Sequence, residues 1–329
     1  MDYQGSNVLV AGGAGLVGQS LVRKLLDRGA SVRATEFQNR KIDLTHKNLE
    51  VVRCDLREPE AARRVFRDMD AAFLAAARVR GAKHLQANPS DLILDYLEMH
   101  SRLIAQAAAA GVERCGFISS CYIYPDTGKP NIEEEGFERD PWIPTNYGIG
   151  WTTRYLETLC RHFHMTSQTK YAIIRPNAYY GPHDNFDPEE SHVIPALIVK
   201  AVRGMNPFEV WGDGRQIRCF TYIDDLAEGN LLNLARNATC DPVNISSPEA
   251  YRISEIVSLI LDILNLDAEV RYDPSKPSTI PYRVSDPTKA KHLLGWEAGT
   301  DIREGLSRTI DWYVKEYRPK LSSKKAGSR

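Results

Sequence analysis

Residues 7–18 read Asn7-Val-Leu-Val-Ala-Gly12-Gly-Ala-Gly15-Leu-Val-Gly18, and this stretch decides the fold. Residues 7–11 are mostly aliphatic or β-branched, which predicts a buried strand. Leucines then recur at helical spacing over 16–28, and Gly29 ends that predicted helix. The glycines therefore occupy the turn between a strand and a helix.

The alternation of strand and helix continues from this stretch through the first half of the chain. Predicted strands lie at 31–36, 49–54, 71–76, 114–119 and 171–175, and long predicted helices lie at 90–110 and 145–164. Such alternation predicts a parallel sheet with helices on both faces, and right-handed crossovers make the sheet doubly wound. We therefore expect an α/β fold with a Rossmann-type, doubly wound parallel sheet.

The glycine turn predicts a site for a dinucleotide. Glycines permit a tight turn and let the backbone approach a pyrophosphate, and the helix N-terminus offers unpaired N–H groups at its positive end. Without a ligand the same string would be a flexible turn, but the flanking strand and helix favour the dinucleotide. The residues expected to contact the pyrophosphate are Gly12, Gly15, Leu16, Val17 and Gly18.

Glu36 ends the second predicted strand and follows Gly18 by eighteen residues. A carboxylate at this point accepts hydrogen bonds from the adenosine ribose hydroxyls and repels a 2′-phosphate. The sequence therefore predicts NAD rather than NADP as the cofactor, a preference that the nearby Arg40 softens.

The ends of the next two strands complete the predicted cofactor site. Asp55, with Leu56 beside it, is placed either to meet the adenine amino group or to cap a helix from Arg57 onward, and the two roles are equally supported. Small side chains after the fourth strand would let the backbone lie against the cofactor, at Ala75, Ala76 and Ala77.

Composition limits the remaining function classes. The 329 residues are 43% apolar and 26% charged, as in ordinary globular proteins, and a net charge of -1 predicts neither a nucleic-acid nor a membrane partner. The N-terminus lacks the basic region of a signal peptide, and no run reaches the ~18 apolar residues of a membrane span. Six cysteines without a C-x-x-C pair predict free thiols, a cytoplasmic location and no metal site.

The composition of the chain changes after Pro176, where Pro, Gly and Asp become frequent and the regular alternation of strands and helices stops. We expect residues 1–175 to form the NAD-binding Rossmann domain. Residues 176–319 should form mainly a smaller C-terminal substrate-binding lobe, with helices near 192–203, 224–236 and 253–265 and with segments returning to the first domain. The polar, basic residues 320–329 should be a flexible tail.

Longer motifs resemble those of one enzyme group, the extended short-chain dehydrogenase/reductase (NAD-dependent epimerase/dehydratase) family. Its GxxGxxG spacing is that of Gly12, Gly15 and Gly18. Four further segments are similar to GDP-L-fucose synthases: Phe73-Leu-Ala-Ala-Ala-Arg78, Ser119-Ser-Cys-Tyr-Ile-Tyr-Pro125, Tyr180-Gly-Pro-His-Asp-Asn-Phe186 and Ser191-His-Val-Ile-Pro-Ala196. Residues 211–224 and 242–245 look more like GDP-mannose 3,5-epimerases. The resemblance covers roughly residues 7 to 315 and implies NAD and a nucleotide-diphosphate sugar, most closely a GDP-sugar.

The resemblance also implies catalytic residues. In that family a Ser and a Tyr hydrogen-bond the reacting group of the sugar, and a Lys four residues after the Tyr lowers the tyrosine pKa and holds the nicotinamide ribose. Ser120 and Tyr147 match the first two, so Tyr147 would be the acid/base, but the Lys position is Trp151. An indole carries no charge and donates a single hydrogen bond, so it cannot replace the ammonium group. Tyr147 and Trp151 are nonetheless expected beside the cofactor.

Other positions also depart from the family pattern. The Asn of the long helix falls at Tyr96, and the proton-transferring Cys falls at Tyr122, with Cys121 one position early. The Asn that helps to hold the substrate diphosphate falls at Ala178, with Asn177 one position early. Three of the four departures place a large aromatic ring near the expected nicotinamide site.

Retained positions point to the substrate. His192 matches a histidine proposed as an acid in sugar epimerisation; the alternative is a surface or capping histidine, and the functional interpretation is favoured. Arg218 and Arg283 match basic positions that clamp the diphosphate, where planar donors suit phosphate oxygens. Trp211 would stack on the nucleobase or else belong to the core. We count Trp211, Arg218, Arg283 and Asn177 as candidate substrate-binding residues.

Three functions remain open on the sequence alone. The first is an NAD-dependent epimerase, dehydratase or reductase acting on a nucleotide sugar, most closely a GDP-sugar. The second is a redox-inactive relative that catalyses proton transfer or isomerisation on a carbonyl compound. The third is a non-catalytic NAD- or nucleotide-binding protein. The family also implies a homodimer formed through the two long helices, with apolar residues such as Leu103, Ile104, Tyr155, Leu156 and Leu159 at the interface or, alternatively, against the sheet.

Overall fold

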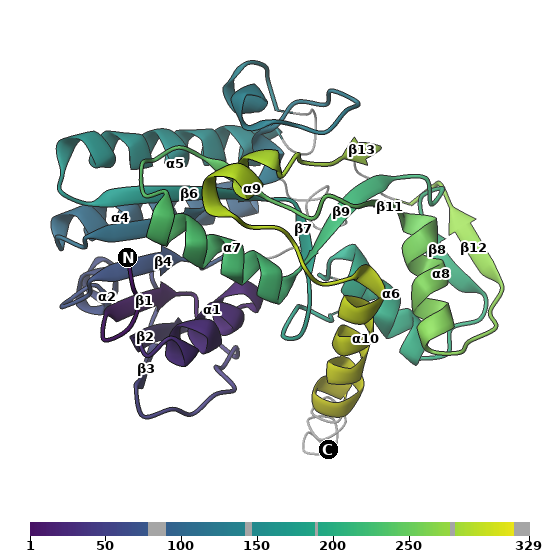
Figure 1. Ribbon diagram of the computed structural model, residues 1–329. Coiled ribbons are helices and arrows are strands. Elements are labelled where there is room, and N and C mark those ends of the chain that lie inside the picture. Colours follow the sequence, from purple (N-terminus) through teal and green to yellow (C-terminus); the bar gives the residue numbers. More distant parts are fainter. Residues whose placement is uncertain (78–89, 142–146, 188–189, 277–279, 319–329) are drawn as a thin grey trace.

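A seven-stranded parallel sheet forms the centre of the computed structural model, with the strand order β10-β6-β5-β4-β1-β2-β3 (Figure 1). Its strands are β1 (Asn7–Ala11), β2 (Ser31–Glu36), β3 (Leu49–Arg53), β4 (Ala71–Leu74), β5 (Arg114–Ile118), β6 (Lys170–Pro176) and β10 (Val243–Ile245). The structure describes residues 1–77, 90–141, 147–187, 190–276 and 280–318. The order of strands reverses between β1 and β4, which is where open α/β sheets bind ligands. The predicted Rossmann-type fold is confirmed.

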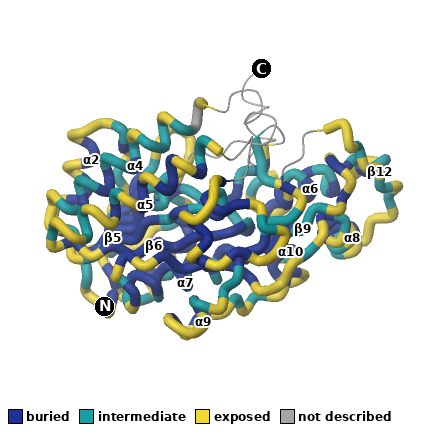
Figure 2. Tube along the Cα trace, turned by 90° about the horizontal axis from the view of Figure 1, so that it is seen from above, coloured by how far each residue is buried: buried dark blue, intermediate teal, exposed yellow. Residues whose placement is uncertain are grey.

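Helices cover both faces of this sheet because its strands are apolar on both sides. On one face lie α1 (Leu16–Asp27), α7 (Ile223–Arg236) and α9 (Thr288–Leu294), which share a buried core with β1 and β2. On the other lie α2 (Pro59–Val65), α4 (Asp91–Ala109) and α5 (Tyr147–Thr166), which form a second core over β4 and β5. Figure 2 shows the buried strands enclosed between these more exposed layers.

The second half of the chain adds smaller sheets beside the central one (Figure 1). Strand β9 (Ile217–Tyr222) pairs with β11 (Ala250–Arg252), β13 (Tyr282–Arg283) and β7 (Ala178–Tyr180). Strand β8 (Phe208–Trp211) pairs with β12 (Val270–Asp273). The remaining helices are α6 (Val193–Val202), α8 (Ile253–Ile263) and α10 (Ile302–Trp312), followed by a π turn at Tyr313–Tyr317; short 3₁₀ turns lie at Cys121–Ile123 and Glu133–Phe137.

Strand β10 links the two halves of the chain. Although it lies far along the sequence, it extends the central sheet as the parallel neighbour of β6. Helix α7, from the same half, packs against α1. The expected tail, residues 320–329, lies outside the described residues. Within the described part of the chain, no helix is both long and apolar enough to cross a bilayer.

Candidate active site

The glycine turn joins β1 to α1 and leaves the first amides of the helix without helical partners. Helix α1 begins at Leu16 with Gly15 as its N-cap, and no side chain caps it. The Gly15 carbonyl accepts the first helical hydrogen bond, at 2.9 Å, from the residue four positions later. The amides of Leu16, Val17 and Gly18 precede that bond, so they mark the positive end of the helix and can receive an anion.

The three motif glycines are required for different reasons. A Cβ added at Gly12 would lie 2.4 Å from Cα of Ala76, and one at Gly18 would lie 2.1 Å from the Gly12 carbonyl oxygen, so chain packing forbids both. A Cβ at Gly15 would meet only the Gly12 oxygen, at 3.4 Å. Chain packing therefore does not explain Gly15, whereas a pyrophosphate resting on the free amides does.

The carboxyl end of β2 adjoins this turn. The Gly12 amide donates to Oγ1 of the buried Thr35 at 2.8 Å, which fixes the glycine turn against β2. Glu36 is the last residue of β2, and its carbonyl accepts the Cys54 amide at 3.1 Å. The half-buried Glu36 thus ends β2 beside the turn, at the strand end where a ribose would be expected.

Asp55 does not cap the following helix. Helix α2 begins at Pro59 with Glu58 as its N-cap, so the alternative of a helix cap is wrong. The Asp55 carboxylate instead accepts the backbone amide of Arg57 at 3.0 Å and its guanidinium at 2.7 Å. These bonds to Arg57 hold the pKa of Asp55 below its ordinary value. Leu56 is buried in the core next to this turn.

Arg57 connects three parts of the predicted adenine end. Besides Asp55, its guanidinium donates to Asp95 of α4 at 3.1 Å. The same group lies over the ring of Phe37, 5.9 Å from its centroid. Asp55, which was predicted to meet the adenine amino group, is therefore oriented and partly neutralised by a neighbouring cation.

The backbone after β4 lies against the glycine turn at Ala75 and Ala76. The Ala75 amide donates to the Ala11 carbonyl at 2.9 Å, and Cα of Ala76 is the atom that a side chain at Gly12 would strike. A buried histidine supports this segment: Nε2 of His100 lies 2.8 Å from the Ala76 carbonyl. Burial lowers the pKa of His100 to about 4, so the ring is neutral and donates this bond at neutral pH.

Tyr96 stacks near that histidine rather than opening a polar pocket. Its ring lies 4.3 Å from the His100 ring, and its hydroxyl donates to the Ile118 carbonyl at 3.3 Å. Burial raises the pKa of Tyr96, so the phenol stays protonated. The tyrosine in place of the family asparagine therefore fills space between α4 and the end of β5.

Ser120 and Tyr147 lie on two elements that pack together. Ser120 caps the turn Cys121–Ile123, where its Oγ accepts the Tyr122 amide at 3.2 Å. Tyr147 opens α5 and is 43% exposed. A Cβ at Gly150, in the first turn of α5, would lie 2.6 Å from the Tyr122 carbonyl oxygen, so the helix start rests directly on that turn.

The indole of Trp151 packs against the guanidinium of Arg154. The Arg154 guanidinium lies 4.8 Å from the centre of the indole, a cation–π contact. That arginine donates to the carbonyls of Ile123, at 2.6 Å, and Arg139. Arg154 therefore fastens α5 to the neighbouring loops, and its donors are directed at backbone oxygens rather than at the Tyr147 hydroxyl.

A buried ion pair supports the Ser120 loop. Arg175 of β6 forms two bonds to Glu157 of α5, at 2.9 and 2.7 Å, and both side chains are almost fully buried. Glu157 also accepts from the hydroxyl of Ser119, and Arg175 donates to Tyr124 at 3.2 Å. Residues on both sides of Ser120 are thus fixed by one network.

The lobe contributes two adjacent arginines. Arg218 of β9 is 4% exposed and donates to backbone carbonyls, including that of Ile217 at 2.7 Å. Burial and the neighbouring Arg283 lower the pKa of Arg218 to about 9. Arg283 of β13 lies over the ring of Tyr122, 4.7 Å from its centroid. Burial alone would lower the pKa of Arg283, but Cys121 and Tyr122 raise it above its ordinary value.

The two arginines differ in their free donors. Nε and Nη1 of Arg283 are buried and have no hydrogen-bond partner in the described chain. Such donors are costly unless a ligand or water satisfies them. Arg283 therefore fits the predicted diphosphate contact, while Arg218 donates to the carbonyls of Ile217, Pro281 and Ile280 of the chain itself.

His192 lies at the start of α6 beside a buried carboxylate. It occupies the N-cap position but its side chain makes no cap bond, so the capping alternative is wrong. Its Nδ1 is 3.7 Å from Oδ1 of Asp184, and its ring meets the edge of Tyr179 at 6.4 Å. Asp184 is 5% exposed, and its Oδ2 has no partner in the described chain. At 3.7 Å the two groups are close but not hydrogen-bonded, and Nδ1 of His192 also has no partner in the described chain. A histidine beside a carboxylate is a candidate for proton transfer.

The two remaining substrate-binding candidates, Asn177 and Trp211, differ in burial. Asn177 is buried, donating to Ser285 at 3.0 Å and accepting the Ala178 amide at 2.9 Å, so its amide group is engaged by the chain. Trp211 is 37% exposed at the end of β8, so the alternative of a core tryptophan is wrong. The Lys200 ammonium lies 5.7 Å from its ring centre.

Sequence reasoning missed three residues of this region: Arg57, His100 and Asp184. Asp184 belongs to the quoted motif Tyr180–Phe186, and its spacing from His192 could have suggested the pair. No local signal distinguishes His100, because its partner comes from another element. Arg57 bonds Asp55 two positions before it, but its bond to Asp95 of α4 leaves no local pattern.

Comparisons with known proteins agree with this geometry. A model of the NAD dependent epimerase/dehydratase family matches residues 8–246. GDP-L-fucose synthase 1 of Arabidopsis thaliana is 31% identical over 322 residues, covering 96% of this chain and 95% of that protein. GDP-mannose 3,5-epimerase 1 of Oryza sativa subsp. indica is 28% identical over 313 residues, covering 94% and 82%.

Solved structures give the same answer. MoeE5 in complex with UDP-glucose and NAD is 26% identical, with a TM-score of 0.81, and the match covers 96% of this chain and 99% of that one. These matches confirm the resemblance inferred from the motifs. The glycine turn, the switch point between β1 and β4 and the family match all lead to one conclusion: the chain belongs to the NAD dependent epimerase/dehydratase family.

Proposed function

We propose that the protein is an NAD-dependent enzyme that epimerises or reduces the sugar of a nucleotide diphosphate, with a GDP-sugar as the substrate. The observation that carries the proposal is the turn at Gly15, where packing leaves room above three free amides. A pyrophosphate fills such a cradle, and the strand reversal beside it is the usual place for a dinucleotide.

The residues around the cradle fit NAD. The amides of Leu16, Val17 and Gly18 would hold its pyrophosphate, Glu36 would accept the ribose hydroxyls, and the chain at Ala76 would lie along it. NAD would supply a hydride acceptor at the sugar carbon. The chain's own part is to orient the sugar against it and to move protons.

Tyr147 and Ser120 are proposed to act at the reacting carbon. Ser120 would donate a hydrogen bond to the sugar oxygen, and the Tyr147 hydroxyl would exchange a proton with it. His192 would be the second proton donor, at a neighbouring carbon. Asp184, 3.7 Å from Nδ1 of His192, would hold the ring so that Nε2 faces the substrate.

Arg283 is proposed to bind the diphosphate through its two buried, unpartnered nitrogens. Trp211 would stack on the base, since its ring is partly exposed. Relatives differ in the base: the Arabidopsis relative is named for a GDP-sugar, and MoeE5 is described with UDP-glucose. Calorimetric titration with GDP and UDP separates the two, and we expect GDP to bind more tightly.

One experiment tests the proposal as a whole. The purified protein is denatured, and the released nucleotide is identified together with its redox state. We expect NAD or NADH, and turnover when the native protein is incubated with GDP-sugars. Absence of cofactor release, together with no binding of added NAD, would contradict the proposal.

A second candidate function is proton transfer or isomerisation on a carbonyl substrate without a net hydride step. It is favoured by Trp151, which replaces a cation and is itself stacked on Arg154. Replacing Trp151 by Lys tests it: if hydride transfer is limited by the missing charge, the rate of NADH formation should rise at least about tenfold, and Trp151→Met should not raise it. An equal rate in all three proteins would favour the second candidate.

We also propose that the protein works as a homodimer in the cytoplasm. Of the five interface residues suggested by the sequence, Leu103, Ile104 and Leu156 are 0% exposed and belong to the core of a single chain, so they cannot form the interface. Leu94 of α4, 70% exposed, and Tyr155 of α5, 55% exposed, are among the exposed apolar residues that these helices offer to a second copy. The six unpaired thiols suit a reducing compartment.

A further inference from the structure

The outer edge of the central sheet, along β3, combines unpaired backbone amides and carbonyls with positively charged side chains. Strand β3 is the last strand of the sheet, and among the described residues it pairs with β2 alone. The Val32 amide bonds the Asn48 carbonyl, and the Cys54 amide bonds the Glu36 carbonyl. In a parallel pair, alternate residues of β3 direct their amides and carbonyls at β2. In this register the amides and carbonyls of Val51 and Arg53 point away from β2, toward the free edge.

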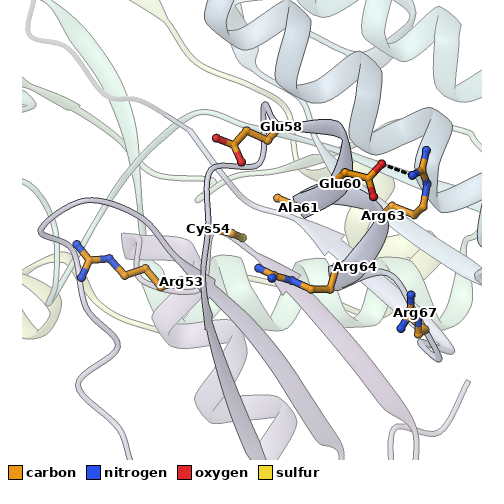
Figure 3. Close-up of a pocket in the computed structure, with 8 residues that line it drawn as sticks. All are labelled: Arg53, Cys54, Glu58, Glu60, Ala61, Arg63, Arg64 and Arg67. Carbon is orange, nitrogen blue, oxygen red and sulfur yellow. Dashed lines mark hydrogen bonds and ion pairs between the residues drawn. The ribbon is translucent and has the colours of Figure 1, made fainter.

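Two adjoining hollows, of about 400 and 390 Å³, run between this edge and α2. Both are lined by Arg53, Arg64 and Arg67. Figure 3 shows Arg64 reaching from α2 toward Cys54 at the end of β3, with Arg53 on the opposite side. A single groove therefore follows the free edge of β3 with an arginine on each side.

These three arginines lack carboxylate partners, unlike their neighbours. Arg63 pairs with Glu60, and Arg33 pairs with Glu50 at 2.7 Å. No ion pair joins Arg53, Arg64 or Arg67 to any carboxylate of the described chain; Arg53 makes one bond, to the Gln38 carbonyl at 3.2 Å. Glu50, Glu58 and Glu60 also line the hollows, and Glu50 and Glu60 are the partners of Arg33 and Arg63. The arginines outnumber these carboxylates, so the net charge along the groove is positive.

We propose that this groove binds an acidic, extended segment of a partner protein, which adds a strand to the edge of β3. An added strand would pair with the outward amides at Val51 and Arg53, and its alternating side chains would reach Arg53 on one face and Arg64 and Arg67 on the other. Val51, 43% exposed, would be covered by it.

Other occupants fit less well. A second copy of the chain, pairing β3 with β3, would bring the same arginines together and repel itself. The chain's own last residues, 320–329, carry Lys320, Lys324, Lys325 and Arg329 and are basic. A nucleic acid would match the charge but would leave the outward amides of the strand without partners.

The test uses the full-length protein and a short fluorescein-labelled peptide in which glutamate alternates with valine. We expect saturable binding by fluorescence anisotropy, and slower hydrogen exchange at the amides of Val51 and Arg53 on binding. The double variant Arg64→Glu/Arg67→Glu should bind about tenfold more weakly, since two favourable charge contacts become repulsive. Both residues are exposed, so its Tm should not change.

Two controls make the test specific. Arg271→Glu changes an exposed charge on β12, away from the groove, and should bind the peptide like the parent protein. Val51→Pro removes one outward N–H, which an edge strand tolerates, and should weaken binding without unfolding the chain.

The proposal is overturned if the peptide does not bind, or if charge reversal at Arg64 and Arg67 weakens binding no more than Arg271→Glu does. It is also overturned if an oligonucleotide binds as tightly as the peptide and neither ligand slows hydrogen exchange at Val51. Equal binding of the peptide with lysine in place of glutamate would also overturn it.

Discussion

Gly15 differs from Gly12 and Gly18 in what surrounds it, and the difference separates binding from folding. The other two glycines are packed against backbone atoms at 2.4 and 2.1 Å from an added Cβ, whereas Gly15 faces open space above the first amides of α1. A methyl group at Gly15 would therefore occupy the place of the ligand rather than that of the chain.

We predict that Gly15→Ala lowers NAD affinity by at least about tenfold and leaves Tm unchanged within error, because only the ligand contact is lost. Gly18→Ala should instead lower stability by roughly 2 kcal/mol or more, because the backbone must move. Calorimetric titration with NAD and thermal unfolding of both variants measure the two effects. A large loss of Tm in Gly15→Ala would show that packing, not a ligand, requires that glycine.

Single residues show where sequence reasoning ends. The glycine spacing and the acid at Glu36 could be assigned because their partners are close in sequence or belong to a fixed strand–turn–helix unit. The bond from Arg57 to Asp95 and the bond from His100 to Ala76 could not, because each joins different elements. The orphan nitrogens of Arg283 depend likewise on packing around β13.

At the scale of elements, the buried pair of Glu157 and Arg175 joins α5 to β6 beside the loop that carries Ser120. Both charges are desolvated, and each satisfies the other through two bonds. Breaking such a pair leaves an unpaired buried charge, which usually costs more than the pair itself contributes.

We predict that Arg175→Met lowers the free energy of unfolding by about 3–5 kcal/mol, because Glu157 then stays buried without a cation. The double variant Arg175→Met/Glu157→Met should recover part of that loss, because no charge remains. Urea unfolding followed by circular dichroism measures both. Additive losses in the double variant would show that the two side chains are not coupled.

Some helices and strands could be predicted from their own sequence, whereas others form only because they pair with a strand that is distant in the sequence. The predicted strand at 31–36 and the helix over 16–28 agree with β2 and with α1, which ends at Asp27, since each carries its own periodicity and a clear end signal. Strands β7, β11 and β13 have three, three and two residues and were not predicted. They exist through pairing with β9, which no local pattern records.

At the scale of the whole molecule, one buried histidine makes stability depend on pH. The pKa of His100 is about 4 in the folded protein and about 6.5 in an unfolded chain. Between these values the unfolded state binds one more proton than the folded state, so the free energy of unfolding falls as pH drops from about 6.5 to about 4. The full effect is on the order of 3 kcal/mol.

We therefore predict that His100→Gln flattens this part of the pH profile, while an exposed histidine exchanged in the same way, His292→Gln, leaves the slope unchanged. The measurement is urea unfolding at a series of pH values between about 4 and 7. An unchanged slope in His100→Gln would mean that the buried ring does not control acid sensitivity.

Assembly is the second property of the whole molecule. Tyr155 is 55% exposed on α5 and contributes to the apolar face proposed for the dimer. We predict that Tyr155→Glu shifts the protein toward the monomer in sedimentation velocity, because two buried carboxylates would meet across a two-fold axis. Tyr155→Phe should remain dimeric, and a parent protein that sediments as a monomer would contradict the proposed interface.

The insertion of β10 beside β6, together with the packing of α7 on α1, means that the later part of the chain is not a detachable module. A fragment ending near Pro176 would leave β6 without its neighbour β10 and the apolar face of α1 without α7. Such a fragment would tend to aggregate. Opening and closing around a substrate must then come from loops rather than from swinging one half of the protein about a hinge.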